Sequence, residues 1–326
     1  MKVFVTGATG YLGRYLVVKL ANLGYIVHAL VRDPEKSVLN PHENIKIFQG
    51  DLSDEMSINR AMQGCENVFH LAAFTDLKCT QIEKFHEVNV VGTRNVLLAA
   101  RENGIKRFVF TSSLSVFGPS NGKFPITEKQ PRLCSFQNDY ELTKAMAEDL
   151  VLKENKNGLQ TIVLNVSRIY GPGDPGFSNG VNKFIEIIMN KKRLFFPSRI
   201  WVETNYVFIE DVVQAHINAL QLGTSGEKYI IGGINSTYSQ FISTIKQISK
   251  SSCKVIKINY QLIKALLGIN RLFMMVLGRR NIISPPVLDS LFTNRKASSQ
   301  KGVTQLKYRV TSLAAGVEKT VSFLNN

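Results

Sequence analysis

The first fourteen residues constrain the fold more than any other stretch of this 326-residue chain. Residues 2–6 are rich in β-branched and aromatic side chains, as a buried strand requires, and Gly7, Gly10 and Gly13 follow closely. Leucines at helical spacing come next: Leu12, Leu16, Leu20 and Leu23. The stretch therefore predicts a strand, a tight glycine turn and a helix.

The glycine spacing indicates what this turn can hold. Glycines allow a pyrophosphate to approach bare backbone at a helix N-terminus, where free N–H groups and the helix dipole favour an anion. The spacing here is G-x-x-G-x-x-G, whereas the commonest dinucleotide fingerprint is G-x-G-x-x-G. An ordinary strand-to-helix turn is the alternative, and the rest of the chain decides between the two.

Further strands alternate with helices after this unit. Four segments have strand-like composition: 26–31, 45–48, 68–73 and 107–113. A long helix is predicted at 82–103, between the last two of these strands. This alternation predicts an α/β fold with a parallel, doubly wound sheet. His70 is expected to lie in its core.

The chain is long enough for two parts. We expect residues 1–174, with a returning segment near 205–235, to form a nucleotide-binding domain. Residues 175–326 are expected to form a smaller, mostly helical and discontinuous substrate-binding part.

Side chains at the strand ends bear on cofactor choice. Arg32 follows the second strand, where an arginine pairs with a 2′-phosphate and a carboxylate pairs with a free 2′-hydroxyl. Arg32 therefore favours NADP, although the neighbouring Asp33 leaves NAD possible. Asp51, after the third strand, is expected near an adenine amino group.

The net charge of +15 is concentrated in the second half of the chain. Residues 177–326 contain 20 Lys/Arg and 7 Asp/Glu, which gives +13. Three features would explain this positive charge: a generally Lys-rich and Asn-rich composition, binding of an anionic substrate or membrane surface, or binding of nucleic acid. No nucleic-acid-binding motif supports the last, so none is predicted.

The cysteines and the N-terminal residues bear on the cellular compartment and on metal binding. The four cysteines are scattered and lack metal-ligand spacing, so reduced thiols and no metal site are expected. Gly7 and Gly10 interrupt the N-terminal apolar run before a signal peptide could form, which favours a cytoplasmic protein.

A tyrosine and a lysine form the candidate catalytic pair. Tyr140 and Lys144 are four residues apart in a predicted helix, which places the phenol and the ammonium on one face. A nearby ammonium is expected to lower the pKa of the phenol and suit it to proton transfer. Ser113 stands 27 residues before Tyr140, at the end of a predicted strand.

With these motifs the sequence resembles the extended short-chain dehydrogenase/reductase superfamily, also called the NAD-dependent epimerase/dehydratase family. The matching segments run in family order over most of the chain: Thr6–Gly13, Gly50–Leu52, His70–Ala73, Asn89–Thr93, Thr111–Ser113, Tyr140–Lys144, Tyr170–Asp174 and Phe208–Val212. The resemblance implies a Rossmann-type domain that holds NAD(P). It also implies that Ser113, Tyr140 and Lys144 form the catalytic triad.

The resemblance assigns roles to individual residues. Tyr140 would transfer a proton to or from the reacting oxygen, Ser113 would hydrogen-bond that oxygen, and Lys144 would hold the ribose hydroxyls. The expected cofactor-binding residues are Gly7, Thr9, Gly10, Tyr11, Leu12, Gly13, Arg32, Asp51, Leu52, Leu71, Ala72, Ala73, Thr111, Tyr140 and Lys144.

Other segments narrow the branch of the family. Family dehydratases carry an Asp-Glu pair after the catalytic hydroxyl residue, where this chain has Leu114 and Ser115. Segments 30–34, 169–174 and 294–297 are most similar to dihydroflavonol reductase-like and 3β-hydroxysteroid dehydrogenase-like members. Those members usually have a proline where Val166 stands.

We therefore predict an oxidoreductase that prefers NADP and acts on a carbonyl or secondary alcohol of a small, partly apolar substrate. A sugar or sugar-nucleotide epimerase is the alternative within the fold. Sugar-nucleotide epimerases of the family usually carry an arginine that binds the sugar-nucleotide diphosphate in the segment before Phe208, and segment 201–207 of this chain has none. A non-catalytic NADP-sensing or RNA-associated protein is the alternative of another class, and such proteins commonly lose the tyrosine or the lysine.

The apolar stretch 262–277 has two interpretations. Lys264 and Arg271 interrupt it, so it falls short of the ~20 apolar residues of a membrane span. It is expected to roof the substrate pocket, or to act as a lid that also contacts a membrane, with cations at 264, 271, 279 and 280 meeting anionic headgroups. The resemblance further implies a homodimer through the helices at 82–103 and 140–155.

Overall fold

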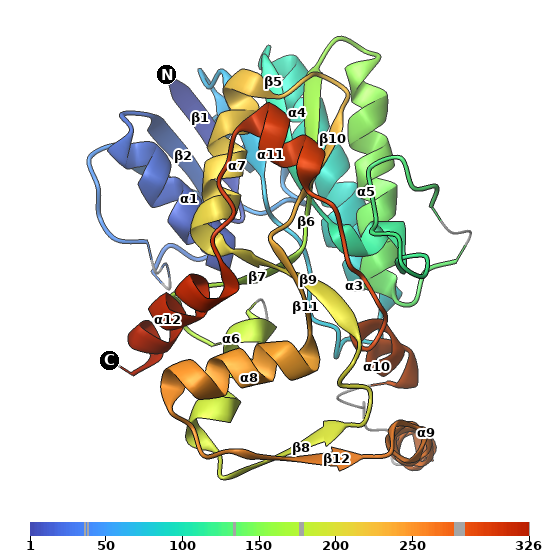
Figure 1. Ribbon diagram of the computed structural model, residues 1–326. Helices are drawn as coiled ribbons and strands as arrows, with labels where there is room; N and C mark the ends of the chain where they lie inside the picture. Colours follow the sequence, from blue (N-terminus) through green and yellow to red (C-terminus); the bar gives the residue numbers. More distant parts are fainter. Residues whose placement is uncertain (36, 38, 133–134, 176–178, 277–283, 326) are drawn as a thin grey trace.

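A seven-stranded parallel sheet forms the centre of the computed structural model, which describes residues 1–35, 37, 39–132, 135–175, 179–276 and 284–325 (Figure 1). The strand order is β10-β6-β5-β4-β1-β2-β3. The strands are β1 Lys2–Thr6, β2 Ile26–Val31, β3 Ile45–Gln49, β4 Asn67–His70, β5 Arg107–Ser113, β6 Gln160–Val166 and β10 Lys228–Ile231. The predicted α/β class and parallel sheet are confirmed.

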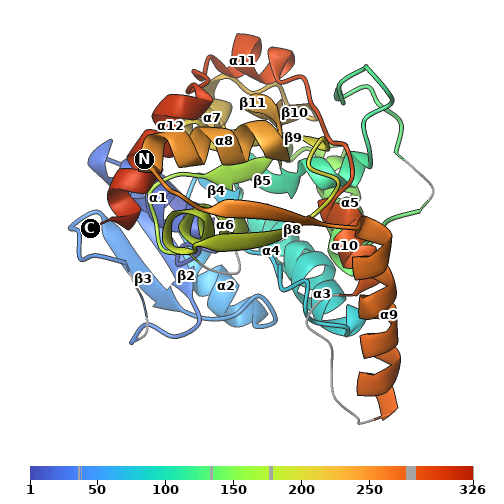
Figure 2. The same cartoon turned by 60° about the horizontal axis from the view of Figure 1, so that its bottom comes forward.

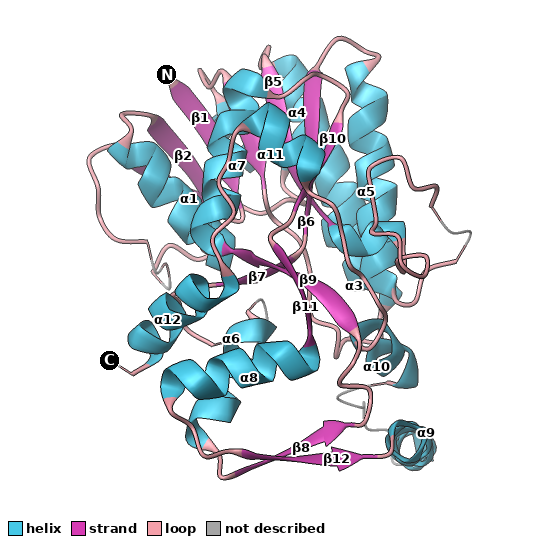
Figure 3. Cartoon of the chain, in the orientation of Figure 1, coloured by secondary structure: helices cyan, strands magenta, loops and turns pink. Residues whose placement is uncertain are grey.

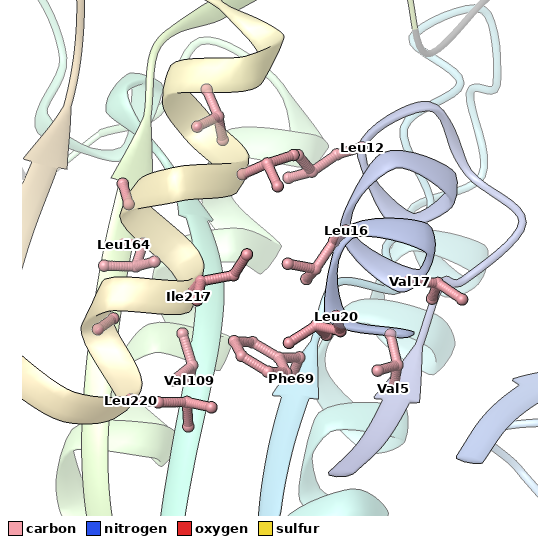
Figure 4. Packing of buried hydrophobic residues seen from close by; sticks show 14 of the residues in the cluster. Val5, Leu12, Leu16, Val17, Leu20, Phe69, Val109, Leu164, Ile217 and Leu220 are labelled. Atoms are coloured by element: carbon pink, nitrogen blue, oxygen red, sulfur yellow. The ribbon is translucent and has the colours of Figure 1, made fainter. Parts of the chain in front are cut away.

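Helices cover both faces of this sheet. One face packs against α1 Tyr11–Asn22 and α7 Ile209–Leu222, and the other against α2 Glu55–Met62, α4 Gly92–Glu102 and α5 Asp139–Asn155. Figure 4 shows the first contact, where leucines of α1 and Ile217 of α7 meet Phe69 and Val109 of the sheet. Leu16 and Leu20 are fully buried there, which explains the helical leucine spacing.

Two predicted elements differ in detail. The predicted strand 68–73 is wrong at its end, because β4 stops at His70 and the next three residues leave the sheet. The helix predicted at 82–103 forms as α3 Ile82–His86, a π-helical turn Glu87–Val91 and α4. His70 is fully buried, with ring nitrogens 2.6 Å from the Thr6 hydroxyl and 2.9 Å from the Thr93 hydroxyl, as the core assignment predicted.

A smaller part follows the large sheet (Figure 3). Its buried apolar side chains form a core of their own. Its strands form one three-stranded and one two-stranded sheet: β7 Arg168–Tyr170, β9 Glu203–Phe208 and β11 Ile234–Thr237, then β8 Arg193–Pro197 and β12 Lys254–Ile258. Its helices are α6 Gly180–Asn190, α8 Tyr238–Ser249, α9 Tyr260–Val276, α10 Pro285–Leu291 and α12 Leu313–Leu324, and α11 Gln300–Leu306 packs beside α7. The domain boundary at residue 174 stays a prediction.

The described side chains of α9 do not cover the main cavity. Figure 2 shows α9 extending from the edge of the molecule, beside β8 and β12. Leu262, Leu266 and Ile269 are more than half exposed, and no residue from 260 to 270 lines the main cavity. The predicted roof is therefore wrong for these residues, because only one stripe of the helix packs on the core and the opposite stripe faces outward. Residues 277, 279 and 280 of the predicted stretch lie outside the described residues.

Within the described part of the chain, we find no helix that combines the length and the apolar character required to cross a bilayer.

Candidate active site

A cavity of about 910 Å³ opens at the carboxyl ends of the parallel strands and continues into the smaller part. Residues that end or follow strands line one half of it, from Thr6 at the end of β1 to Ser113 and Val166 at the ends of β5 and β6. Parallel α/β sheets bind ligands at this edge. Every cofactor-binding and catalytic residue predicted from the sequence lines this cavity.

The glycine turn forms one end of the cavity. Gly7 has φ +70°, and a Cβ there would lie 2.6 Å from the Ala72 nitrogen. A Cβ on Gly13 would lie 2.0 Å from the Gly7 oxygen, so the turn and the helix pack too closely for a side chain. The helix α1 starts after Gly10, and no side chain caps it. Its first-turn N–H groups and its dipole therefore suit an anion such as the pyrophosphate of a dinucleotide.

A later segment fixes this turn in place. The Tyr11 hydroxyl donates to the Gly171 oxygen at 2.9 Å, and the Tyr15 hydroxyl donates to the Pro172 oxygen at 2.8 Å. Gly173 lies so close to the Tyr11 ring that a Cβ would approach it to 2.5 Å. The segment 170–174 that helped to identify the family thus anchors the helix of the glycine turn.

Arg32 and Asp51 lie where the sequence placed them, at the ends of β2 and β3. Arg32 is exposed and lines the cavity. One Asp51 carboxylate oxygen accepts hydrogen bonds from the Ser53 backbone nitrogen at 3.0 Å and from the Ser53 hydroxyl at 2.8 Å. Their contacts with adenosine stay predictions.

Lys144 is a buried cation on α5. Its Nζ donates to the Thr111 oxygen at 2.7 Å and lies 4.1 Å from the centre of the Phe110 ring. Burial lowers the pKa of Lys144 to about 7, and the nearby Glu148 carboxylate opposes that shift. Lys144 therefore lies at the cavity wall with its ammonium held against the end of β5.

Tyr140 and Ser113 face the same cavity. Burial raises the pKa of Tyr140, and a hydrogen bond with Ser113 acts in the opposite direction. The expected lowering of this pKa by Lys144 is wrong for the protein alone, because removing the phenolate from water dominates and the ammonium is bound to a backbone oxygen. The Ser113 hydroxyl lies 2.9 Å from the Ser115 hydroxyl.

Buried polar contacts hold α5 in position, and the sequence analysis did not predict them. Glu141, next to Tyr140, forms a 2.6 Å ion pair with Arg295, and both side chains are buried. Glu148, one turn after Lys144, accepts from the Ser112 hydroxyl at 2.6 Å and pairs with Arg132. These partners are up to 154 positions apart, so no local pattern could have paired them.

The second half of the cavity is mainly apolar and aromatic. Its walls come from α6, β8, β9, α8 and the end of α10: Val181, Phe184, Phe196, Tyr206, Tyr238, Phe241, Leu291 and Phe292. Among the described residues that line this half, Arg168, at the start of β7, is the cation. The sequence analysis singled out the motif beginning at Ile169 and missed the arginine directly before it.

Comparison with known proteins agrees with this geometry. Residues 3–232 match the family described as "NAD dependent epimerase/dehydratase family". The chain belongs to the NAD-dependent epimerase/dehydratase family. The resemblance predicted from its motifs is confirmed.

Individual relatives cover most of the chain. A putative dihydroflavonol 4-reductase of Synechocystis sp. is 32% identical over 252 residues, which are 76% of this chain and 72% of the relative. The 3beta-hydroxysteroid-dehydrogenase/decarboxylase isoform 1 of Arabidopsis thaliana is 29% identical over 347 aligned positions, covering 97% of this chain and 78% of the relative. Both belong to the branches that the sequence analysis named.

The fold has solved counterparts as well. The UDP-glucose 4-epimerase of Thermus thermophilus in complex with NAD superposes with a TM-score of 0.79 at 22% identity, covering 100% of this chain and 99% of that structure. At this identity the similarity concerns the fold alone.

Proposed function

We propose that this protein is an NADP-preferring oxidoreductase that reduces a carbonyl, or oxidises a secondary alcohol, on a small, partly apolar molecule. The observation that carries the proposal is that Ser113, Tyr140 and Lys144 line one cavity together with the glycine turn. The relatives named as a dihydroflavonol reductase and a hydroxysteroid dehydrogenase support this reaction class.

The residues of this chain divide the work. NADP, when bound, supplies or accepts a hydride at its nicotinamide ring. The turn at Gly7 and Gly10 would hold its pyrophosphate, and Lys144 would hold its ribose hydroxyls. Ser113 would donate a hydrogen bond to the substrate oxygen and stabilise the charge that develops there.

Tyr140 would move the proton of the substrate oxygen. Its pKa is raised in the protein alone, so the phenol is protonated at neutral pH and is ready to donate to a carbonyl oxygen during reduction. In the opposite direction, hydride removal from an alcohol requires Tyr140 to accept the proton.

Tyr140→Phe tests the acid–base assignment. We expect kcat/KM for NADPH-dependent reduction of a panel of apolar ketones to fall by roughly 10²–10⁴-fold, because the variant lacks the proton donor. The dissociation constant for NADPH, measured by fluorescence titration, is expected to change little and serves as the control. Full activity in this variant would contradict the assignment.

The same assay separates the alternatives. A reductase consumes NADPH in step with the ketone. An epimerase would convert a sugar nucleotide while its cofactor stays unchanged overall, and a non-catalytic cofactor-binding protein would bind NADPH without turnover of any substrate.

Arg32→Ala tests cofactor choice. An arginine contact with a 2′-phosphate is a charge-assisted hydrogen bond, so its loss is expected to weaken NADPH binding by about tenfold or more while NADH affinity stays constant. Isothermal titration with both cofactors measures this. Equal affinities for the two cofactors in both proteins would remove the argument for NADP.

A further inference from the structure

Arg168 is a half-buried cation in the cavity wall that meets no carboxylate. Its guanidinium donates from Nη1 to the Tyr238 hydroxyl and from Nη2 to the Leu291 oxygen at 2.8 Å. Among the described residues, no Asp or Glu oxygen lies within 4.0 Å of it, and the residues outside the described ranges include no Asp or Glu. By contrast, Arg132 and Arg295 both pair with buried glutamates.

A second polar group lies unsatisfied beside Arg168. Tyr206 is 2% exposed and lines the cavity, and its hydroxyl makes no hydrogen bond of acceptable geometry among the described residues. Arg168 and Tyr206 are paired across β7 and β9, so their side chains lie on the same face of that sheet. Burial raises the pKa of Tyr206, and the Arg168 guanidinium opposes this shift. A buried hydroxyl without a well-formed hydrogen bond is unfavourable, so a ligand oxygen here would improve the site.

The charged side chains that line the cavity indicate where an anion would bind. The acidic side chains that line it are Asp51, after β3 in the cofactor half, and Glu87, at the start of the π-helical turn. Neither lies within ion-pair distance of Arg168. A guanidinium has five N–H donors. Two are used in the contacts above and a third faces the Tyr206 hydroxyl, so donors remain for a carboxylate.

We propose that Arg168 and Tyr206 bind a carboxylate of the substrate, which makes the substrate an apolar oxo acid or hydroxy acid. This inference rests on the proposed function, because it uses the same cavity. The carboxylate binds at Arg168, the hydrocarbon part packs against Phe184, Phe196 and Phe292, and the reacting carbonyl lies at Ser113 and Tyr140. The charge of Arg168 thereby selects acids over neutral ketones of the same shape.

The test compares an acid with its neutral analogue on the NADP-saturated protein. Octanoate and octan-1-ol are titrated by calorimetry into wild type, Arg168→Met and Tyr206→Phe. Wild type is expected to bind octanoate at least tenfold more tightly than octan-1-ol. Arg168→Met is expected to weaken octanoate binding by roughly 10- to 100-fold, and to change octan-1-ol binding by less than about threefold.

Two variants separate recognition from structure. Tyr206→Phe removes a hydroxyl that makes no well-formed hydrogen bond, so this variant is expected to be at least as stable as wild type in thermal unfolding yet to bind octanoate several-fold more weakly. The Tyr206→Phe variant tests carboxylate binding even if Arg168→Met fails to fold. Arg193→Met removes an exposed arginine of β8 that does not line the cavity, and is expected to leave both affinities unchanged.

The outcomes distinguish this inference from the function it rests on. If wild type shows no preference for octanoate, or if both Arg168→Met and Tyr206→Phe keep it, the carboxylate site is wrong. If such a protein still binds NADPH and reduces neutral ketones, only the carboxylate inference fails. If it does not bind NADPH, the proposed function fails first.

Discussion

Lys144 illustrates how one buried charge links stability to the candidate chemistry. Only 2% of the residue is exposed, and burial lowers its pKa to about 7 from an ordinary 10.5. Between these pH values the unfolded chain therefore binds more protons at this residue than the folded chain. The stability of the folded protein then rises with pH across this window, by up to about 1.4 kcal/mol per pH unit.

Lys144→Met removes this unfavourable charge. The variant without cofactor is expected to be more stable than wild type below pH 7, and its advantage is expected to shrink as the pH rises toward 10.5. Urea unfolding of both proteins at pH 6, 8 and 9.5 measures the difference. An advantage that is the same at all three values would mean that Lys144 keeps its ordinary pKa.

At the scale of single residues, the sequence predicted which side chains lie together, but not how the protein shifts their pKa values. The spacing of Tyr140 and Lys144, the position of Ser113 at a strand end and the family resemblance together predicted that all three lie at one cavity, and all three line it. The direction of the Tyr140 pKa shift was not predictable, because it depends on burial by segments distant in the sequence. Arg168 was missed for the same reason.

The helix α5 carries Tyr140 and Lys144, and its first turn is fixed by one buried ion pair. Arg295 donates to Glu141 at 2.6 Å and also contacts Ser290, so the segment after α10 holds the helix start. Arg295→Met leaves the Glu141 carboxylate buried without its cation. We expect this to reduce the free energy of unfolding by about 3–5 kcal/mol.

A double variant provides the control for this prediction. Adding Glu141→Gln removes the unpaired charge, so the double variant is expected to recover more than half of the lost stability in urea unfolding. A loss equal to that of Arg295→Met alone would show that the arginine acts through packing instead of charge.

Helices and strands with a regular hydrophobic pattern were predictable from the sequence. The residues at which they end and the elements against which they pack were less predictable. The strands at 26–31 and 107–113 form at the predicted residues. The periodic pattern of α9 predicted a helix, but a pattern does not say which face meets the core. The expected dimer also stays a prediction. Leu98 of α4 and Met146 of α5 are each more than a third exposed and are available to a second copy.

At the scale of the whole molecule, the basic second half suggests contact with an anionic membrane surface. Leu262, Leu266 and Ile269 form the exposed stripe of α9, and α9 follows β12, whose Lys254 and Lys257 are exposed. Lys264, which was expected to meet headgroups, instead pairs with Asp289 at 2.7 Å. Apolar side chains flanked by cations suit an interfacial helix.

Vesicle binding tests this contact. Wild type is expected to sediment with phosphatidylglycerol vesicles at low salt, and a variant with Glu at 262, 266 and 269 is expected to remain in solution. Met56→Glu, a change at an exposed methionine of α2, is the matched control and is expected to sediment like wild type. Equal binding by the triple variant would exclude the α9 stripe as the contact.

The central claim is that one cavity brings the glycine turn, Ser113, Tyr140 and Lys144 around a bound dinucleotide. A crystal structure of the protein grown with NADP tests it most directly. We predict pyrophosphate density at the N-terminus of α1, with the nicotinamide ring beside the Tyr140 hydroxyl and the ribose hydroxyls within hydrogen-bond distance of Lys144 Nζ. An empty cavity at saturating NADP, or a nicotinamide ring placed away from Tyr140, would contradict the account.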